Sequence, residues 1–173
     1  MAPTVLLMTT TERADLLESL AAQRGFLLVT VQGLTDEQAR QRTTVSELTL
    51  GGLVKHVAHT ERGWVDFIEH GTRAMEATED SWAAQADSFT LREDETLAGV
   101  IAEYAEVAKR TDALVESLPS LDVAHPLPEA PWFPAGAVRS ARRVFTHVVG
   151  ETAQHAGHAD ILREALDGQK TMG

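Results

Sequence analysis

The sequence predicts an all-α protein, a four-helix bundle that forms a single domain over residues 1–173. Two observations lead to this prediction. Four long segments repeat their apolar residues with the period of an α-helix, whereas strand signals are weak throughout. Two of the connections between these segments hold about 20 residues, against roughly 2–8 residues in a simple helix–helix turn.

The first long helix is expected from about Glu12 to Gln32. Thr10 or Thr11 can serve as its N-cap, and Gly33 follows its end. The segment LTDEQARQR then predicts a short helix capped by Thr35, with acidic residues in its first turn, where the helix dipole favours them. The apolar stripe of the first helix consists of Leu16, Leu17, Leu20, Phe26, Leu27 and Val31.

The second long helix is expected from about Val45 to His70, with Ser46 as its cap and Gly71 at its end. Gly51 and Gly52 lie in its first turns, where each costs roughly 1 kcal/mol relative to Ala. A glycine pair at this place indicates close packing against a neighbouring segment. The apolar stripe consists of Leu50, Leu53, Val54, Val57, Trp64 and Ile68.

The third long helix is expected from about Asp94 to Leu118, followed by Pro119. The fourth is expected from about Ala137 to Leu166, with Gly168 as the residue that ends it. Its predicted buried stripe contains Val138, Ala141, Phe145, Val148, Val149, Thr152, His155, Ala156, Ala159 and Leu166.

The connections 72–93 and 119–136 are long enough to cross the bundle, so the second and third long helices are expected to run parallel. The later connection contains AHPLPEAPWFPAG, with four prolines around Trp132 and Phe133. This composition favours an ordered, extended lid over a flexible linker. Long loops of this kind often carry function.

Three side chains on two of the helices form a candidate metal site. A helix turns by about 100° per residue, which places His155 inside the buried stripe and Glu151 on the same side one turn earlier. His56 lies at the margin of the stripe on the second long helix. Two imidazoles and one carboxylate are enough to bind a divalent ion with coordination positions left open. Metal binding should weaken below about pH 6, because protons compete for the histidines.

The positions of these histidines can also be explained without a metal. A histidine on an apolar face is more often a core residue whose nitrogens form local hydrogen bonds. His59, His147 and His158 fall nearer the polar faces, where they are either solvated or able to support the ligands. His70 is expected to interact with the dipole at the end of its helix. His125, in the second long connection, has no role that the sequence predicts.

Composition excludes several classes of function. The formal net charge of −11 argues against nucleic-acid binding and against a basic surface for anionic lipid. The chain has no cysteine, which excludes disulfides, a thiolate nucleophile and a Cys-ligated zinc. The N-terminal apolar run lacks a preceding basic region and is too short to span a bilayer, so a cytoplasmic location is expected.

Two sequence blocks resemble the DinB-like superfamily, and in particular its actinobacterial mini-circle-protein branch, which is related to mycothiol-dependent maleylpyruvate isomerase. The blocks are TLGGLVKHVAHTERGW at 49–64 and HVVGETAQHAGHADILREALDG at 147–168. The resemblance implies a bundle in up-down-down-up order. It also implies a metal held by a histidine on the second helix, matched by His56, and by two residues four apart on the last helix. The isomerase-like branch has Glu then His there, as Glu151 and His155 do.

Known activities in this superfamily imply metal-assisted chemistry on a low-molecular-weight thiol. We therefore expect an enzyme that uses Zn²⁺, or Ni, Fe or Mn, with mycothiol or a similar thiol as cosubstrate, and that transfers, isomerises or hydrolyses a small molecule. His59 and His158 are the candidates for orienting ligands or moving a proton. The alternatives are a metal-binding or stress-related protein without turnover, and a dimeric interaction module. A homodimer is expected.

Overall fold

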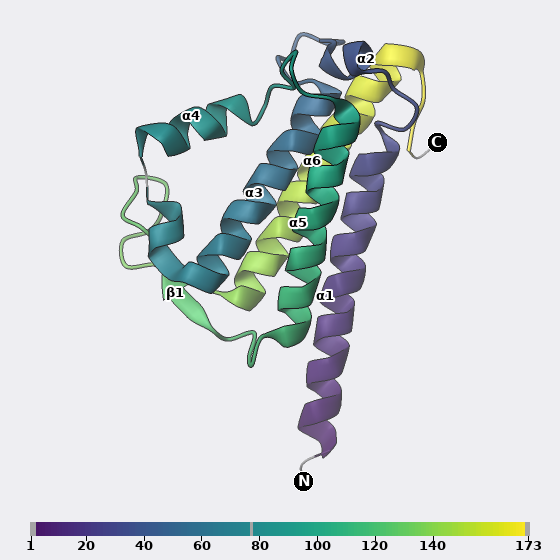
Figure 1. Cartoon of the computed structure of the whole chain (residues 1–173). Coiled ribbons are helices and arrows are strands. Elements are labelled where there is room, and N and C mark those ends of the chain that lie inside the picture. Colours follow the sequence, from purple (N-terminus) through teal and green to yellow (C-terminus); the bar gives the residue numbers. More distant parts are fainter. Residues whose placement is uncertain (1–2, 77, 172–173) are drawn as a thin grey trace.

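A computed structural model describes residues 3–76 and 78–171, with side chains from residue 11 onward. The described residues are mostly helical, which confirms the prediction of an all-α protein. Four long helices lie alongside one another (Figure 1). They are α1 (Pro3–Val29), α3 (Leu50–His70), α5 (Leu97–Ser117) and α6 (Ala141–Asp167).

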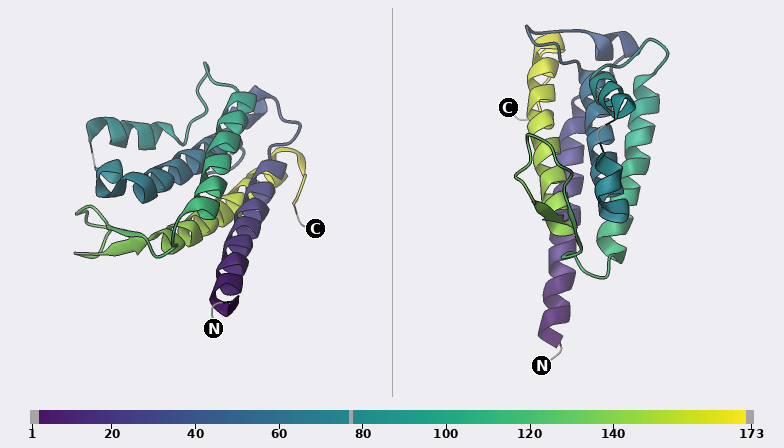
Figure 2. Two further views of the ribbon diagram at one scale, coloured as in Figure 1. Left: turned by 60° about the horizontal axis from the view of Figure 1, so that its bottom comes forward. Right: turned by 90° about the vertical axis from the view of Figure 1, so that its left-hand side faces the viewer.

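Helices α1 and α6 run in one direction, and α3 and α5 run in the opposite direction (Figures 1 and 2). Helix α3 packs against both α5 and α6, while α1 packs mainly on α6. Helices α3 and α6 therefore each have two long helices as main neighbours. Among the described residues, no helix combines the length and the apolar character needed to cross a membrane.

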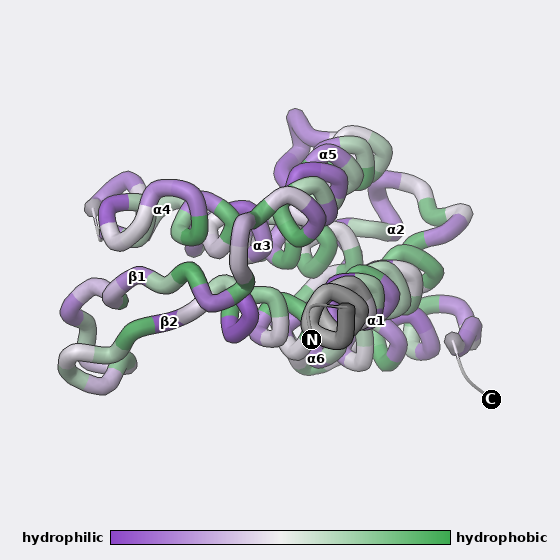
Figure 3. Tube along the Cα trace, turned by 90° about the horizontal axis from the view of Figure 1, so that it is seen from below, coloured by the Kyte–Doolittle hydropathy of each residue, from purple (hydrophilic) through white to green (hydrophobic). Residues whose placement is uncertain are grey.

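Both long connections contain regular structure. The first holds a 3-10 helix, η1 (Gly71–Met75), and α4 (Glu79–Asp87). The second contains β1 (Ala124–Pro126), which pairs antiparallel with β2 (Val138–Ser140) just beyond it. Helix α4 and this hairpin project to the same side of the molecule, away from α1 (Figure 3). The short helix α2 (Asp36–Arg40) has the predicted Thr35 cap, in a capping box with Gln38.

The N-terminal end of α3 differs from the prediction. The helix begins at Leu50, and the cap is Thr49, whose hydroxyl accepts a hydrogen bond from the Gly52 amide. The hydroxyl of Ser46 accepts from the Leu48 amide instead, which stabilises a turn before the helix. The predicted Ser46 cap is therefore wrong, because a second cap residue lies three positions later.

The other long helices also start at different residues. Helix α5 begins at Leu97 after a Thr96 cap, and α6 begins after a Ser140 cap, because residues 138–140 are extended and paired with β1. Val138 is consequently 60% exposed, outside the stripe in which it was predicted. Helix α1 starts at Pro3, so Thr10 and Thr11 lie inside it and are not its cap.

The glycine pair at the start of α3 is where the α4–α5 connection packs, as predicted. A Cβ atom on Gly51 would lie 2.7 Å from the Leu91 side chain, and one on Gly52 would lie 2.0 Å from the Phe89 carbonyl oxygen. Lys55, one turn further along, forms ion pairs with Asp87 at 2.8 Å and Glu95 at 2.9 Å. Together these contacts hold residues 87–95 directly on α3.

The core consists of two apolar clusters. One lies around the first half of α3 and the last half of α6, and the other lies around the opposite ends of these helices. Residues 59–63 of α3 and 150–155 of α6 belong to neither cluster. The predicted α3 stripe is fully buried, whereas Phe26 of the predicted α1 stripe is 43% exposed. A polar layer thus separates the two clusters at mid-height.

Candidate metal centre

The three residues predicted as metal ligands come together where the polar layer meets the first apolar cluster, because His56 lies between Val54 and Val57 of that cluster. His56 of α3 faces Glu151 and His155 of α6, and each residue offers a ligand atom within 4.8 Å of the other two. The rings of His56 and His155 meet edge to face, with centroids 4.9 Å apart. His155 Nε2 lies 3.7 Å from a Glu151 carboxylate oxygen, as expected for residues one helical turn apart.

A hydrogen-bond chain sets the tautomer of His56. The Ser88 hydroxyl lies 2.6 Å from the Gln85 carbonyl oxygen, to which it donates its only proton. His56 Nδ1 lies 3.0 Å from the same hydroxyl oxygen, so Nδ1 must be the donor in that contact. Nε2 of His56 then carries a lone pair, which is the form that a metal requires. Phe89 stacks on the imidazole at 3.7 Å and fixes the plane of the ring.

The imidazole of His155 also has a polar neighbour, on the side away from Glu151. His158, predicted as a supporting residue, places its Nδ1 3.4 Å from Nδ1 of His155. A contact at Nδ1 leaves Nε2 of His155 directed to the side of Glu151. Each candidate imidazole ligand therefore contacts a polar side chain through the ring nitrogen that does not face the carboxylate.

The environment keeps both rings neutral at physiological pH. Burial lowers the pKa of His56 to about 4, and the neighbouring His155 and His59 act in the same direction. Burial also lowers the pKa of His155, with a smaller contribution from His158. A neutral imidazole is the metal-binding form, so proton competition is reduced before any ion binds.

Two other histidines of the prediction occupy different places. His147 Nε2 lies 3.6 Å from the second carboxylate oxygen of Glu151, and its ring meets Trp64 at 4.9 Å. Burial lowers the pKa of His147 despite the opposing effect of Glu151. His59 does not belong to the cluster of three candidate ligands and instead lines an adjoining pocket. Burial lowers the pKa of His59, while a hydrogen bond with Gln85 acts to raise it.

The remaining two histidines lie around the C-terminal end of α3, His70 as its last residue and His125 in β1. His125 donates from Nε2 to the Ile68 carbonyl oxygen at 3.0 Å, so it satisfies one of the free carbonyls at the helix terminus. The sequence indicated no role for it. His70 is exposed at the last position of α3. It lies near Asp66 and Glu69, but Arg110 forms ion pairs with both of those carboxylates and so already balances part of their charge.

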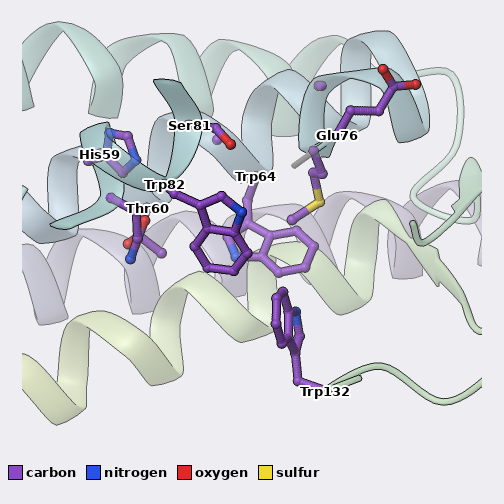
Figure 4. A pocket seen from close by; sticks show the side chains of 11 residues that line it. His59, Thr60, Trp64, Glu76, Ser81, Trp82 and Trp132 are labelled. Carbon is purple, nitrogen blue, oxygen red and sulfur yellow. The ribbon is translucent and has the colours of Figure 1, made fainter. Parts of the chain in front are cut away.

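A pocket of about 480 Å³ lies near the candidate metal centre, and its lining does not include the three candidate ligands themselves. Its lining comes from α3, η1, α4 and the connection that carries Trp132 (Figure 4). Thr60 belongs to this lining, and its hydroxyl oxygen lies 3.5 Å from Nε2 of His56. Trp64 also belongs to it and contacts His147, the neighbour of Glu151. The pocket therefore reaches the side chains that surround the candidate ligands.

The sequence of the chain can be compared with those of known proteins. Residues 15–168 match the sequence model of a family described as mycothiol-S-transferase. The chain belongs to the mycothiol S-transferase family. This assignment confirms the resemblance to the DinB-like superfamily. No curated protein was found to match the chain. For a mycothiol S-transferase family member, a polar site beside a pocket of small-molecule size is the region in which to look for thiol chemistry.

Two residues at the candidate centre were missed by the sequence analysis. Ser88 and Phe89 hold the His56 ring, yet both lie in a connection that the sequence predicted only as a long loop. The available signal was indirect. The glycine pair on the second long helix predicted a close neighbour, and the residues that pack there directly follow Ser88.

Proposed function

We propose that this protein is a divalent-metal-dependent transferase that joins a low-molecular-weight thiol, mycothiol or a close analogue, to a small-molecule substrate. His56, Glu151 and His155 are the proposed metal ligands. The observation that carries the proposal is the chemistry of this donor set. Two neutral imidazoles and a carboxylate lie within mutual reach beside a pocket, and the Nε2 lone pair of His56 is free of a proton.

The donor set fits a catalytic ion better than a structural one. Three protein ligands of the His, His and Glu type leave coordination positions open, whereas structural zinc sites use four protein ligands. Zn²⁺ is the first choice, and Ni, Fe or Mn ions accept the same ligands. Bound there, the ion would lower the pKa of the cosubstrate thiol and favour its thiolate. The chain has no cysteine, so the reacting sulfur has to come from the cosubstrate.

The surrounding residues have distinct proposed roles. Ser88 positions His56 through Nδ1, and His158 positions His155 in the same way. His59 lines the pocket with a lowered pKa, so it is neutral and can accept the proton released when the thiol reacts. We propose that the scaffold is the up-down-down-up four-helix bundle of the superfamily. The homodimer and the cytoplasmic location stay predictions.

The first test is metal analysis of the purified protein by mass spectrometry. We expect a stoichiometric divalent ion in the wild type, and we expect His155→Ala to bind it about 100-fold or more weakly, because ligand loss exceeds the tenfold to 100-fold effect of a supporting residue. His70→Ala, at the exposed end of α3, is the matched control and should keep the ion. Thiol conjugation should stop on chelation and return when Zn²⁺ is added.

An absence of bound ion in the wild type, together with an unchanged His155→Ala variant, would contradict the metal assignment. Bound metal without any conjugation of mycothiol would instead favour the binding protein without turnover.

A further inference from the structure

We infer that the pocket beside the metal centre binds an uncharged aromatic ring of the electrophilic substrate, the molecule to which the thiol is transferred. This inference deepens the proposed function and rests on it for the reaction, although not for the binding. It assigns the substrate class to a particular surface, built from α3, α4 and the connection between β1 and β2.

The composition of the pocket is its first argument. All three tryptophans of the chain, Trp64, Trp82 and Trp132, line it, together with Met75. Figure 4 shows all three indoles among the lining side chains, although they come from three separate segments. A volume of about 480 Å³ lies within the range of small-molecule sites, which are roughly 300–1,000 Å³.

The exposure of two of these rings is the second argument. Trp82 is 51% exposed and Trp132 is 57% exposed, while Trp64 is buried at 6%. Trp82 and Trp132 contact each other edge to face at 5.4 Å, which joins α4 to the later connection. These indoles keep large apolar faces in water. A flat aromatic ligand would bury this surface and gain the edge or stacking contacts that aromatic pairs prefer.

The charges around the pocket favour a neutral ligand over an anionic one. Among the residues that the structure describes, no lysine or arginine lines the pocket, whereas Glu76 does. The guanidinium of Arg139 stacks on Trp64 at 4.9 Å and on Phe133 at 5.6 Å and is not part of the lining. The formal net charge of −11 adds a repulsive field for anions. A carboxylate on the ring should therefore weaken binding.

The position of the pocket gives the ring a function. Its lining residue Thr60 touches His56, and its lining residue Trp64 touches His147, the neighbour of Glu151. A ring bound in this pocket has its electrophilic carbon on the side that faces the candidate metal ligands. The thiolate sulfur forms a bond to that carbon, and the bond to a leaving group such as chloride breaks with its electron pair. The products are the thioether, chloride and the proton of the thiol.

The binding arm of the test uses two unreactive probes, 1,3-dinitrobenzene and its carboxylate 3,5-dinitrobenzoate, without any thiol. Nitroaromatics quench tryptophan fluorescence, and all tryptophan emission of this chain comes from the pocket. We expect saturable quenching by the neutral probe and at least about fivefold weaker binding of the carboxylate by calorimetry. Equal or tighter binding of the carboxylate would overturn the inference.

The variant arm locates the site. Trp132→Ala should weaken binding of the neutral probe about fivefold, since an aromatic pair contributes roughly 0.5–1.5 kcal/mol beyond buried area. Phe26→Ala removes an aromatic ring that is 43% exposed on α1, outside the pocket lining, and should leave binding unchanged. If Trp132→Ala and Phe26→Ala bind the probe equally, the pocket is not the site.

The kinetic arm separates this inference from the proposed function. With 1-chloro-2,4-dinitrobenzene and mycothiol, we expect Trp132→Ala to raise KM for the electrophile about fivefold with little change in kcat. Probe binding without any thiol transfer would contradict the proposed function and support the pocket. Transfer with an unchanged KM in Trp132→Ala would support the proposed function and contradict the assignment of the pocket.

Discussion

Helix α3 carries two buried polar groups about one and a half turns apart, and they are organised in opposite ways. Glu61, which is 1% exposed, is fully satisfied from inside the protein: Arg24 pairs with it, and the Thr111 hydroxyl donates to it. His56, which is 5% exposed, has a protein partner for its Nδ1 but keeps a lone pair at Nε2 that faces two further potential ligands.

The difference indicates what each group does. A buried carboxylate with a guanidinium and a hydroxyl as partners has no capacity left for a ligand, so the Arg24–Glu61 network serves to connect α1, α3 and α5. At His56 Nε2 the acceptor lone pair has only a long contact of 3.5 Å with the Thr60 hydroxyl, so it remains available to an ion or a substrate. Both groups are buried on the same helix, so burial alone does not distinguish them.

The largest expected effect comes from breaking the satisfied network. Glu61→Gln removes the charge that compensates buried Arg24, and we expect a loss of about 3 kcal/mol in the free energy of unfolding. Arg24 keeps a second pair with Asp112 at 2.8 Å, which limits the loss. Chemical denaturation measures the effect. Metal content should not change, because Glu61 does not belong to the candidate metal cluster.

Glu103→Gln provides the control for this prediction. Glu103 of α5 pairs with Arg62 of α3, but the Glu103 side chain is 52% exposed. We expect a loss below about 0.5 kcal/mol. Equal losses in the two variants would show that the buried network is no more important than an exposed ion pair.

The second effect concerns pH and the histidine cluster. Burial lowers the pKa of His56 from 6.5 to about 4. Between these two pH values His56 is therefore protonated in the unfolded chain but not in the folded chain. The free energy of unfolding of the metal-free protein should therefore fall on acidification between pH 6.5 and about 4, by on the order of 2 kcal/mol. Urea denaturation with a chelator present, across this window, measures it.

His56→Gln should reduce this pH dependence. The remainder should come from His155, His147 and His59, whose pKa values burial also lowers. Glu61→Gln should retain the full dependence at lower overall stability. A slope that is unchanged in His56→Gln would show that His56 does not contribute to it. The lowered pKa values also move the expected loss of metal to a lower pH than the value of about 6 predicted from the sequence, because the ligands resist protonation. Metal retention after dialysis at each pH tests that shift.

The smallest effect comes from the residue that orients His56. Ser88→Ala removes the acceptor of the Nδ1 proton, so we expect metal affinity to fall about tenfold in a competition with a chelating dye. Ser88→Thr keeps the hydroxyl and should retain most of the affinity. Ser120→Ala, in the α5–α6 connection, is the serine control. An unchanged affinity in Ser88→Ala would mean that the tautomer of His56 is set elsewhere.

The sequence analysis predicted more of the α6 side of the site than of the α3 side. The i, i+4 spacing of Glu151 and His155 and their place near the buried stripe depend only on helical geometry, and the structure brings them together as expected. For His56 the sequence analysis predicted only a place at the margin of a stripe. Its burial results from Phe89 and Ser88, which lie more than 30 residues away in a connection with no helical period to place them.

The predicted first residues of α3 and α6 were wrong for a related reason. Ser46 and Thr49 are both acceptable cap residues, and local preference does not choose between them. The start of α6 was displaced because residues 138–140 pair with β1, a contact with residues more than ten positions earlier in the chain.

The sequence by itself determined the helical class, the stripes of α3 and α6, the family resemblance and the identity of the three candidate ligands, because each depends on residue type and on a fixed helical repeat. Only the tertiary structure decided which nitrogen of His56 is free, which tryptophans share a pocket, and which buried carboxylate is already satisfied. Those properties depend on distances between segments far apart in the chain. The close approach at Gly51 and Gly52 sets one such distance, and no local pattern encodes its consequence at Ser88.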